Sequence, residues 1–309
     1  MAGLWTYLDG RILRPEDARI GLLTHALHYG TAVFEGIRAY WSEAAGQLNL
    51  VAARAHYTRF ARSARIMRLP LSEDADELVA ITVELLRRSQ LREDVYVRPI
   101  LFAASQDLDV DYRAGGASLA VCLVPMPGQD GQDAYEGAGL RCVTSSWRRV
   151  PDAAMPVRAK VAGAYVNSCL AHLEALDAGC DEAILLTTDG HVSEASAENL
   201  LLLRDGACIT PPVTDDILEG VTRALLLRLL TDDLGVPVLE RSVDRSELYV
   251  CDELLLCGTW TEVAPVTSVD GRAVGDGCPG RIGRELRHRY LAAVRGESPG
   301  HAGWLVPVY

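Results

Sequence analysis

The spacing of apolar side chains predicts helices and strands intermixed along the chain. Apolar residues recur every three or four positions in 51–69 and again after Asp74, which is the period of a helix with one buried face. Asp74 followed by Glu77 is typical of a capping box at the start of the second helix. Short runs rich in Val, Ile and Leu predict strands instead, because branched side chains favour extended backbone. These runs are 31–40, interrupted by Gly36, 95–103 and 118–124.

The second half of the chain continues this mixture. The segment 164–178 is helical and ends at Gly179, a residue suited to the left-handed position after a helix. The pairs Asp189-Gly190 and Asp205-Gly206 predict tight turns between extended runs. The remaining predicted elements are a helix between Gly220 and Gly235, a strand ending at Gly258 and a helix over 281–294. Without a repeat of fixed length, this pattern indicates an α+β fold with mixed sheets and flanking helices.

A linker divides the chain into two predicted domains. Residues 125–139 read PMPGQDGQDAYEGAG and hold two prolines and four glycines, a composition typical of a connection between domains. We therefore expect a smaller N-terminal domain over 1–124 and a larger C-terminal domain over 140–309, joined by the interdomain loop 125–139.

Composition excludes several classes of function. Lys+Arg is 30 and Asp+Glu is 42, so the net charge is -12 and the surface repels nucleic-acid phosphates. No apolar run approaches the ~18 residues of a membrane helix, and the start, MAGLWTYLDG, has no signal-peptide pattern. The eight cysteines, none in C-x-x-C spacing, predict free thiols in a reducing, cytoplasmic location, and no metal-ligand pattern is present.

One lysine is conspicuous by its rarity. Lys160 is the single lysine of the chain, and all the remaining residues among the 30 Lys and Arg are arginine. A guanidinium stays protonated and cannot act as a neutral amine nucleophile, so this lysine favours chemistry at an amine. It lies among small residues, with Tyr165 five positions on. In a dry pocket beside another cation, such an amine forms a Schiff base with an aldehyde. The alternative is a surface lysine left by chance.

Three other features favour an anionic ligand with a phosphate group. Gly220 opens a helix, whose first amides and dipole attract a phosphate, unless the helix is simply capped. The turn Gly258-Thr259-Trp260-Thr261 follows a buried strand and offers amides and hydroxyls, unless it is an ordinary polar turn. Arg59 can bind the same phosphate, or it is a solvated arginine like its neighbours.

Glu194 adds a carboxylate in the small-residue stretch HVSEASAENLL. A carboxylate at such a position is predicted to be partly buried and to need a partner. A protonated pyridine nitrogen is one such partner, because the ion pair keeps the ring able to accept electrons. An arginine side chain is the other possible partner of this carboxylate.

These residues lie in collinear motifs that resemble the branched-chain amino-acid aminotransferases, which belong to fold type IV of the pyridoxal-phosphate (PLP) enzymes. The resemblance extends from about Leu8 to Pro307. Its clearest stretches are HALHYGTAVFEGIRAY (25–40), YVRP (96–99), SEASAENL (193–200), TPPVTDDILEGVTR (210–223) and the GT-x-x-E-V-x-P-V stretch (258–266).

The resemblance implies roles for fourteen residues. Lys160 is the expected Schiff-base lysine and proton shuttle, and Glu194 the partner of the ring nitrogen. The remaining expected cofactor contacts are Arg59, Val221, Thr222 and Thr259 at the phosphate, Tyr165 at the ring oxygen and Leu218 against the ring. The expected substrate contacts are Tyr29, Phe34, Gly36, Tyr96, Arg98, Thr259 and Trp260. Tyr29 is expected to act across the interface of a homodimer.

The chain departs from the family pattern at three positions. The interdomain loop has no aromatic residue before Tyr135, where the family offers an aromatic wall to the substrate side chain. Trp260 stands where the family usually has alanine, and VAGAY (161–165) replaces a glycine pair and asparagine before the tyrosine. The first two departures bear on substrate identity and leave the cofactor chemistry unaffected.

The expected activity is therefore a PLP-dependent transaminase. It moves an amino group between an aliphatic, branched-chain-like L-amino acid and 2-oxoglutarate, with Arg98 accepting the distal carboxylate of glutamate. The alternatives are a transaminase for an unusual amino acid, a D-amino-acid transaminase or aminodeoxychorismate lyase, and a binding protein that keeps the fold without catalysis. EGIR and YVRP argue against the D-amino-acid and lyase alternatives, and the single lysine argues against a binding protein.

Overall fold

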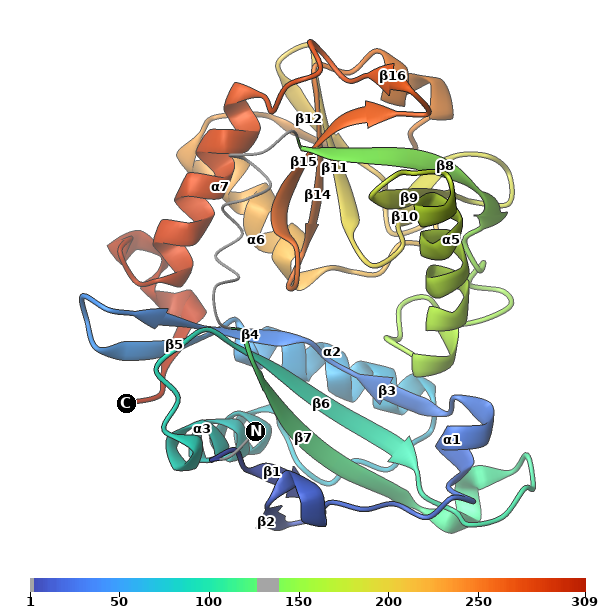
Figure 1. Ribbon diagram of the computed structural model, residues 1–309, viewed down its shortest axis with the longest axis vertical. Helices are drawn as coiled ribbons and strands as arrows, with labels where there is room; N and C mark the ends of the chain where they lie inside the picture. The colour runs from blue at the N-terminus through green and yellow to red at the C-terminus, as the bar shows by residue number, and fades with distance from the viewer. Residues whose placement is uncertain (1–2, 127–138) are drawn as a thin grey trace. The chain divides into compact units, whose positions relative to one another are not determined.

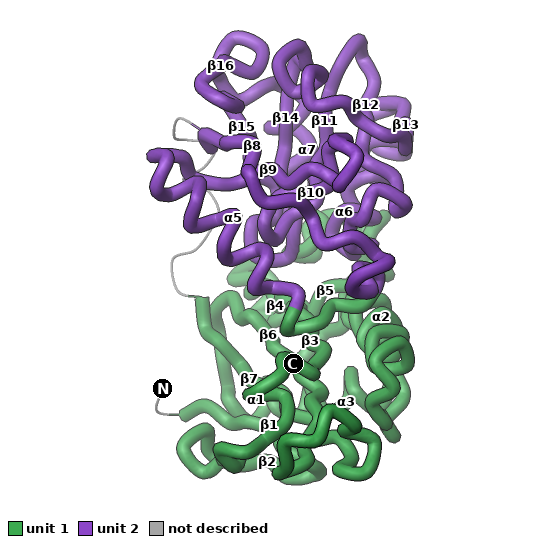
Figure 2. Tube along the Cα trace, turned by 90° about the vertical axis from the view of Figure 1, so that its right-hand side faces the viewer, with its two compact units in different colours: residues 1–129, 159–163, 292–309 green, residues 130–158, 164–291 purple. Residues whose placement is uncertain are grey.

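The computed structural model describes residues 3–126 and 139–309, which form parts of two compact units (Figures 1 and 2). The first unit comprises 1–129, 159–163 and 292–309, and the second comprises 130–158 and 164–291. Most of the predicted interdomain loop, residues 127–138, lies outside the described residues. Lys160 therefore belongs by its contacts to the first unit, although the segments before and after 159–163 in the sequence belong to the second unit.

The first unit is built on an eight-stranded sheet in the order β17-β5-β4-β6-β7-β1-β2, with β3 also paired to β6. Its strands are β1 (Thr6–Leu8), β2 (Arg11–Leu13), β3 (Ala32–Phe34), β4 (Ile37–Ser42), β5 (Gln47–Val51), β6 (Val95–Ala103), β7 (Ala117–Pro125) and β17 (Leu305–Pro307). The strand predicted at 31–40 is two strands, β3 and β4, both antiparallel to β6. Glu35 and Gly36 form the break between them.

Among its described residues, the first unit also contains the α-helices α1 (His25–Tyr29), α2 (Ala53–Ile66) and α3 (Ala75–Ser89). The predicted capping box is present, because Asp74 accepts from the backbone of α3 and Glu77 accepts from the Asp74 N–H. Apolar side chains of α2 and α3 are fully buried, among them Phe60, Leu78 and Leu85. This packing fixes the face of α2 that carries Arg59 and Ser63.

The second unit contains a nine-stranded mixed sheet in the order β10-β9-β8-β15-β14-β11-β12-β13, with β16 paired to β15. Its strands are β8 (Leu140–Arg148), β9 (Glu182–Leu186), β10 (Val192–Ala195), β11 (Asn199–Arg204), β12 (Ala207–Thr210), β13 (Val238–Glu240), β14 (Glu253–Gly258), β15 (Glu262–Val269) and β16 (Arg272–Ala273). The pairs β8–β9, β8–β15 and β12–β13 are parallel, and the others are antiparallel. The first sheet is antiparallel rather than mixed, and together with the mixed second sheet and the separate helices it confirms the α+β class.

The remaining helices are α5 (Tyr165–Asp177), α6 (Val221–Arg228), which continues into a π-helical turn (Leu229–Asp233), and α7 (Arg281–Val294). Short 3₁₀ segments occupy Pro15–Asp17, Tyr112–Gly115, Ala162–Ala164, Arg245–Tyr249 and Pro299–Trp304. The predicted hairpins at Asp189-Gly190 and Asp205-Gly206 are present as β9–β10 and β11–β12. Within the described residues, no helix combines the length and apolar character that crossing a membrane requires.

Candidate active site

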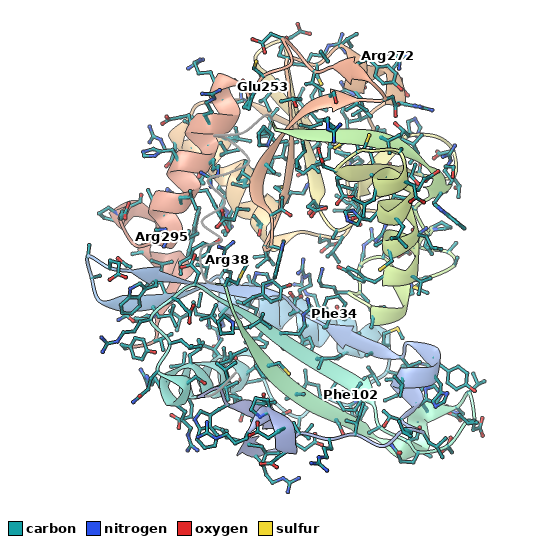
Figure 3. The ribbon with its side chains drawn as sticks, in the orientation of Figure 1. Phe34, Arg38, Phe102, Glu253, Arg272 and Arg295 are labelled. Carbon is teal, nitrogen blue, oxygen red and sulfur yellow. The ribbon has the colours of Figure 1, made fainter. Side chains whose placement is uncertain are left out.

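The backbone of Lys160 is held against two elements of the first unit. Its N–H donates to Ser63 Oγ on α2 (3.1 Å), and its carbonyl accepts from the Phe34 N–H at the end of β3 (3.1 Å). The amine Nζ lies 5.1 Å from the centroid of the Phe34 ring, which is labelled in Figure 3. Both neighbours therefore fix where the half-buried side chain begins, and an aromatic face lies beside the amine itself.

Three predicted substrate residues gather around the same phenylalanine. The Arg98 guanidinium lies 4.5 Å from the centroid of the Phe34 ring, and its Nη2 donates to Tyr96 Oη (3.2 Å). A Cβ added to Gly36 would lie 1.9 Å from Tyr96 Oη, so any side chain there would displace the tyrosine. Phe34, Gly36, Tyr96 and Arg98 thus form one cluster with Lys160, carrying a cation and a phenol suited to a carboxylate.

Arg59 is also in the first unit and is not a solvated arginine. Its side chain is about one-tenth exposed, whereas Arg62, Arg65 and Arg68 of the same segment are more accessible. Its Nε and Nη2 donate to the two carboxylate oxygens of Glu35 at 2.7 and 2.8 Å. His56, one turn earlier on α2, lies 2.8 Å through Nδ1 from the same carboxylate.

Tyr29 lies apart from this cluster on α1. It is exposed, its hydroxyl donates to the carbonyl of Leu108 (3.1 Å), and its ring packs on His25. Apolar side chains of the neighbouring segments are also exposed, including Leu22, Leu27 and Val110. Within the first unit, therefore, Tyr29 belongs to a surface patch.

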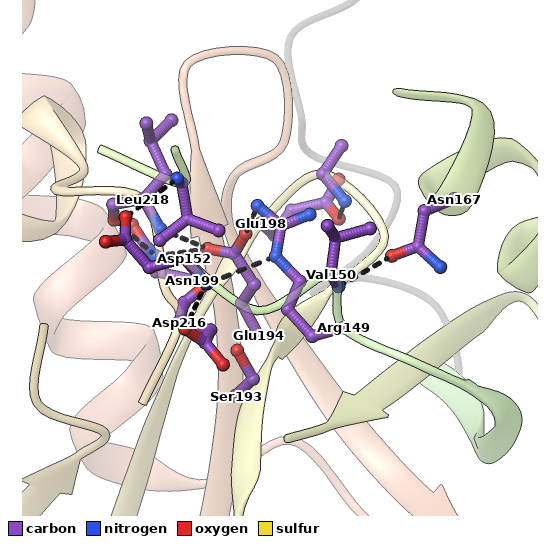
Figure 4. Close-up of polar contacts among 12 residues, drawn as sticks. Arg149, Val150, Asp152, Asn167, Ser193, Glu194, Glu198, Asn199, Asp216 and Leu218 are labelled. Carbon is purple, nitrogen blue, oxygen red and sulfur yellow. Dashed lines mark hydrogen bonds and ion pairs between the residues drawn. The ribbon is translucent and has the colours of Figure 1, made fainter. Parts of the chain in front are cut away.

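Glu194 is the centre of a buried polar network in the second unit (Figure 4). Its Oε1 lies 2.8 Å from Nη2 of Arg149, and its Oε2 accepts from Asn199 Nδ2 (3.0 Å) and the Leu218 N–H (2.9 Å). Arg149 in turn donates through Nε to the carbonyl of Asp216 (3.1 Å). The pairing with an arginine that the sequence left open is thus present, and it holds the carboxylate in a fixed orientation.

The amino end of α6 lies beside this network. Gly220 is the N-cap residue of α6 and has no side chain that could accept from the first amides of the helix, at Val221 and Thr222. A Cβ on Gly220 would lie 1.9 Å from Asn199 Oδ1, so the close approach requires glycine. An uncapped helix start of this kind binds phosphate well.

The turn at 258–261 is anchored by a second glutamate. The Thr261 hydroxyl donates to Glu198 Oε1 (2.7 Å), and Thr259 is half-buried while the Trp260 side chain is 53% exposed. Burial and the nearby charge of Glu182 raise the pKa of Glu198 to about 7, against the opposing hydrogen bond from Thr261. Glu198 therefore titrates near neutrality in direct contact with this turn.

The predicted site residues divide between the two units. The first unit holds Lys160, Arg59, Tyr29, Phe34, Gly36, Tyr96 and Arg98, and the second holds Tyr165 at the start of α5, Glu194, Leu218, Val221, Thr222, Thr259 and Trp260. Sequence reasoning missed Glu35, His56, Arg149 and Asn199 as partners of these residues. Glu35 and Asn199 lie inside the recognised motifs, whereas nothing in the local pattern distinguishes His56 or Arg149.

Comparison with known proteins identifies the family. The model for amino-transferase class IV matches residues 32–269. The chain therefore belongs to the class IV aminotransferases. It is 45% identical to the probable branched-chain-amino-acid aminotransferase of Aquifex aeolicus, over 99% of this chain and 97% of that protein. It is 35% identical to the branched-chain-amino-acid aminotransferase of Escherichia coli, over 97% and 96% of the two chains.

Solved structures agree with this assignment. The crystal structure of the branched-chain aminotransferase from the archaeon Thermoproteus uzoniensis with norvaline has a TM-score of 0.92 and 38% identity, and covers 99% of both chains. That of the branched-chain amino acid aminotransferase from Thermobaculum terrenum in its PLP form has a TM-score of 0.92 and 33% identity, over 99% of this chain and 98% of that one. The fold-type IV expectation is therefore confirmed.

Proposed function

We propose that this protein is a PLP-dependent transaminase acting on an aliphatic, branched-chain-like L-amino acid and 2-oxoglutarate. The observation that carries the proposal is the setting of Lys160. The one lysine of the chain is fixed by backbone hydrogen bonds to α2 and β3, with its amine over Phe34 and in one cluster with Arg98 and Tyr96. The names of the relatives support the same activity.

The residues present suit PLP. Arg59, the uncapped amides of Val221 and Thr222, and Thr259 offer donors to a phosphate. Glu194, a buried carboxylate held by Arg149 and Asn199, suits a protonated ring nitrogen, while Tyr165 and Leu218 would contact the ring oxygen and the ring face. Bound PLP supplies an aldehyde carbon that exchanges amines and a ring that accepts the electron pair left at Cα of the amino acid.

The chain's own groups then perform the proton transfers and the binding. Lys160 Nζ removes the proton from Cα of the amino donor and later delivers a proton as an acid. Glu194 keeps the ring nitrogen protonated. Arg98 binds the distal carboxylate of glutamate, while Tyr96 and the 259–260 turn bind the α-carboxylate, because cationic and hydroxyl donors at these positions match carboxylate oxygens.

We also propose that the protein works as a homodimer. The patch around α1 exposes large apolar side chains, with Leu22 83% and Val110 77% exposed, and Tyr29 lies within it. Surfaces of this kind are covered in assemblies, and a second copy is the occupant that would let Tyr29 reach an active site. A reducing, cytoplasmic location fits the eight free cysteines.

The central experiment pairs a substrate panel with covalent mapping. Purified protein loaded with PLP is assayed with 2-oxoglutarate against L-leucine, L-isoleucine, L-valine, D-alanine and L-alanine, following the aminated cofactor by absorbance. We expect turnover with the branched L-amino acids and none with D-alanine. Activity with D-alanine alone would favour the D-amino-acid transaminase alternative. Borohydride reduction should fix the cofactor on the peptide containing Lys160, and a label on another peptide would refute the proposal.

Trp260 provides a test of substrate selection. Because its side chain stands in the turn proposed to receive the α-carboxylate, Trp260→Ala should enlarge the pocket and raise kcat/KM for bulky donors relative to small ones. The expected change in the leucine-to-alanine ratio is about 10-fold, the scale set by one or two methylene groups. Trp147→Ala, which removes another exposed tryptophan of the second unit, is the control. An unchanged ratio would place Trp260 outside the pocket.

A further inference from the structure

Glu35 and Arg59 form a buried ion pair in the first unit, and the mechanism above gives the glutamate no role. The Glu35 side chain has no exposed surface, and both its oxygens receive a donor from Arg59, at 2.7 and 2.8 Å. Its backbone is fixed as well, because its N–H donates to the carbonyl of Pro99 (2.9 Å). A buried ion pair is weak support for stability, since its desolvation cost offsets its attraction. Glu35 directly follows Phe34, which contacts Lys160, so the ion pair is close enough to act in the site.

Charge and hydrogen bonding define the protonation of this cluster. Burial raises the pKa of the Glu35 carboxyl, but the charge of Arg59 and the hydrogen bonds from His56 and Arg59 outweigh burial and hold that pKa well below its usual range. Burial, with the charges of Arg59 and Lys160, lowers the pKa of His56 more than Glu35 raises it. Glu35 is therefore an acceptor-only carboxylate, and neutral His56 donates to it from Nδ1.

We propose that Glu35, supported by His56, is a positioning residue that orients the Arg59 guanidinium for the phosphate of the cofactor. Two parallel hydrogen bonds define the plane of the guanidinium. The carboxylate that accepts them is fixed by His56 and the Gly36 N–H, and the Glu35 backbone is fixed by β6. A donor oriented before the ligand arrives loses less freedom on binding. This inference rests on the proposed role of Arg59 as a phosphate contact.

The substitution Glu35→Gln distinguishes orientation from charge. A glutamine side chain would keep the volume but would turn an amide N–H₂ toward Arg59 or His56, both of which are donors. Arg59 would then move, and the phosphate contact would weaken. If charge alone mattered, removing the carboxylate would leave Arg59 uncompensated and would strengthen phosphate binding instead. Orientation thus predicts that Glu35→Gln weakens PLP binding, whereas charge alone predicts that it strengthens PLP binding.

The experiment compares two cofactor forms that differ only in the phosphate. Apo-protein is titrated with PLP and with pyridoxal, and the dissociation constants are obtained from absorbance and tryptophan fluorescence. For Glu35→Gln we expect PLP affinity to fall about 10- to 100-fold, the scale of hydrogen bonds to a charged group, while pyridoxal affinity changes less than about threefold. His56→Asn keeps a donor near the position of Nδ1 and should bind PLP like the wild type, whereas His56→Leu should not.

A double-substitution cycle and a matched control complete the design. In the background Arg59→Gln, Glu35→Gln should no longer change the PLP-to-pyridoxal ratio, because its effect acts through Arg59. Asp94→Asn breaks a comparably buried arginine pair of the same unit, with Arg38 at 3.2 Å, and should leave the ratio unchanged. If Glu35→Gln does not fold, Glu35→Asp replaces it, and the same loss of ratio is expected because the shorter side chain cannot keep both bonds.

Equal losses for PLP and pyridoxal would overturn the proposal, since they would mean that Glu35 only maintains the fold. Unchanged or tighter PLP binding would overturn it too. Failure of the proposed function has a different signature: wild-type protein would bind PLP no better than pyridoxal, or would bind it without transaminating any donor.

Discussion

Glu194 and Arg149 form an ion pair in which both side chains are less than one-tenth exposed. Glu194→Gln would leave a buried guanidinium without its carboxylate, and we expect the free energy of unfolding to fall by about 3 kcal/mol. It would also remove the charge that we propose keeps the ring nitrogen protonated, so kcat should fall about 100-fold in the PLP-loaded enzyme. Urea unfolding and steady-state kinetics measure the two effects.

Glu240→Gln is the control for this substitution. Glu240 pairs with Arg223 at the same 2.8 Å, but half of the Glu240 side chain is exposed, and Arg223 keeps its hydrogen bonds to the Thr210 hydroxyl and the Pro211 carbonyl. The loss of stability should therefore stay below about 1 kcal/mol. Turnover should not change. If Glu194→Gln turns over like the wild type, Glu194 has no part in the reaction.

Glu198 predicts a pH dependence of stability. Its pKa is about 7 in the folded protein, compared with 4.5 for an unperturbed glutamate, so the folded state binds the extra proton between these values. The stability that this group contributes is therefore full below about pH 4.5 and is lost as the pH rises to 7. Glu198→Gln should match the wild type at about pH 5 and exceed it in urea midpoint at about pH 8, provided that Thr261 keeps its acceptor.

Glu84→Gln, an exposed glutamate on α3, should show no such difference between the two pH values. The charged groups facing Glu198 are Glu182 and Glu194, both of which oppose its ionisation. A Glu198→Gln protein that is less stable than the wild type at the higher pH would contradict the assignment of a neutral carboxyl at this position.

At the residue scale, the sequence predicted the groups that we propose act directly, and it missed the groups that contact them in the structure. Lys160 is identifiable because lysine chemistry cannot be replaced by arginine. Glu35 meets Arg59 only because β3 ends beside α2, and the chain separates the two residues by 24 positions. Arg149, which follows β8, likewise meets Glu194 on β10, a tertiary contact that local patterns do not contain.

At the scale of elements, prediction succeeded where a local signal is sufficient. The strand β6 and the helix α7 have the predicted bounds. Gly179 follows the end of α5 and has the left-handed conformation that the sequence predicted there. The extended run predicted between the turns at Asp189-Gly190 and Asp205-Gly206 is two strands, β10 and β11, which pair with different neighbours. The reason is tertiary: residues 196–198 leave the ladder, and Asn199 and Glu198 bind polar partners at Glu194 and Thr261.

The capping box of α3 gives the element-scale prediction. Asp74→Ala would remove the acceptor for the N–H groups of Asp76 and Glu77, so the unfolding free energy should fall by about 1 kcal/mol. Chemical denaturation of the apo-protein measures the change. Glu84→Ala, in the middle of the same helix, loses one exposed pair with Arg88 and should cost only about 0.3 kcal/mol. Equal losses would show that the cap contributes nothing specific.

At the scale of the whole molecule, the first unit exposes several large apolar side chains, and we propose that a second copy covers them. Large side chains around α1 are exposed, among them Ile20, Leu22, Leu27, Leu108 and Val110, and they accompany Tyr29. Where such side chains adjoin, the apolar surface is larger than a monomer commonly exposes. With a net charge of -12, the rest of the surface repels other acidic chains, so association should be confined to this patch.

The double substitution Leu22→Asp with Val110→Asp tests the homodimer. Two carboxylates in this patch would have to lose water and face their own copies across the interface, so the dimer should dissociate into monomers. Sedimentation velocity measures the mass, and circular dichroism checks that the fold is kept. Because Tyr29 is proposed to act across the interface, the folded monomer should bind PLP but lose most of its turnover. Leu239→Asp, which adds a carboxylate to an exposed leucine of β13, should remain dimeric and active. A double variant that stays dimeric would move the interface elsewhere, and an active monomer would remove Tyr29 from the partner's site.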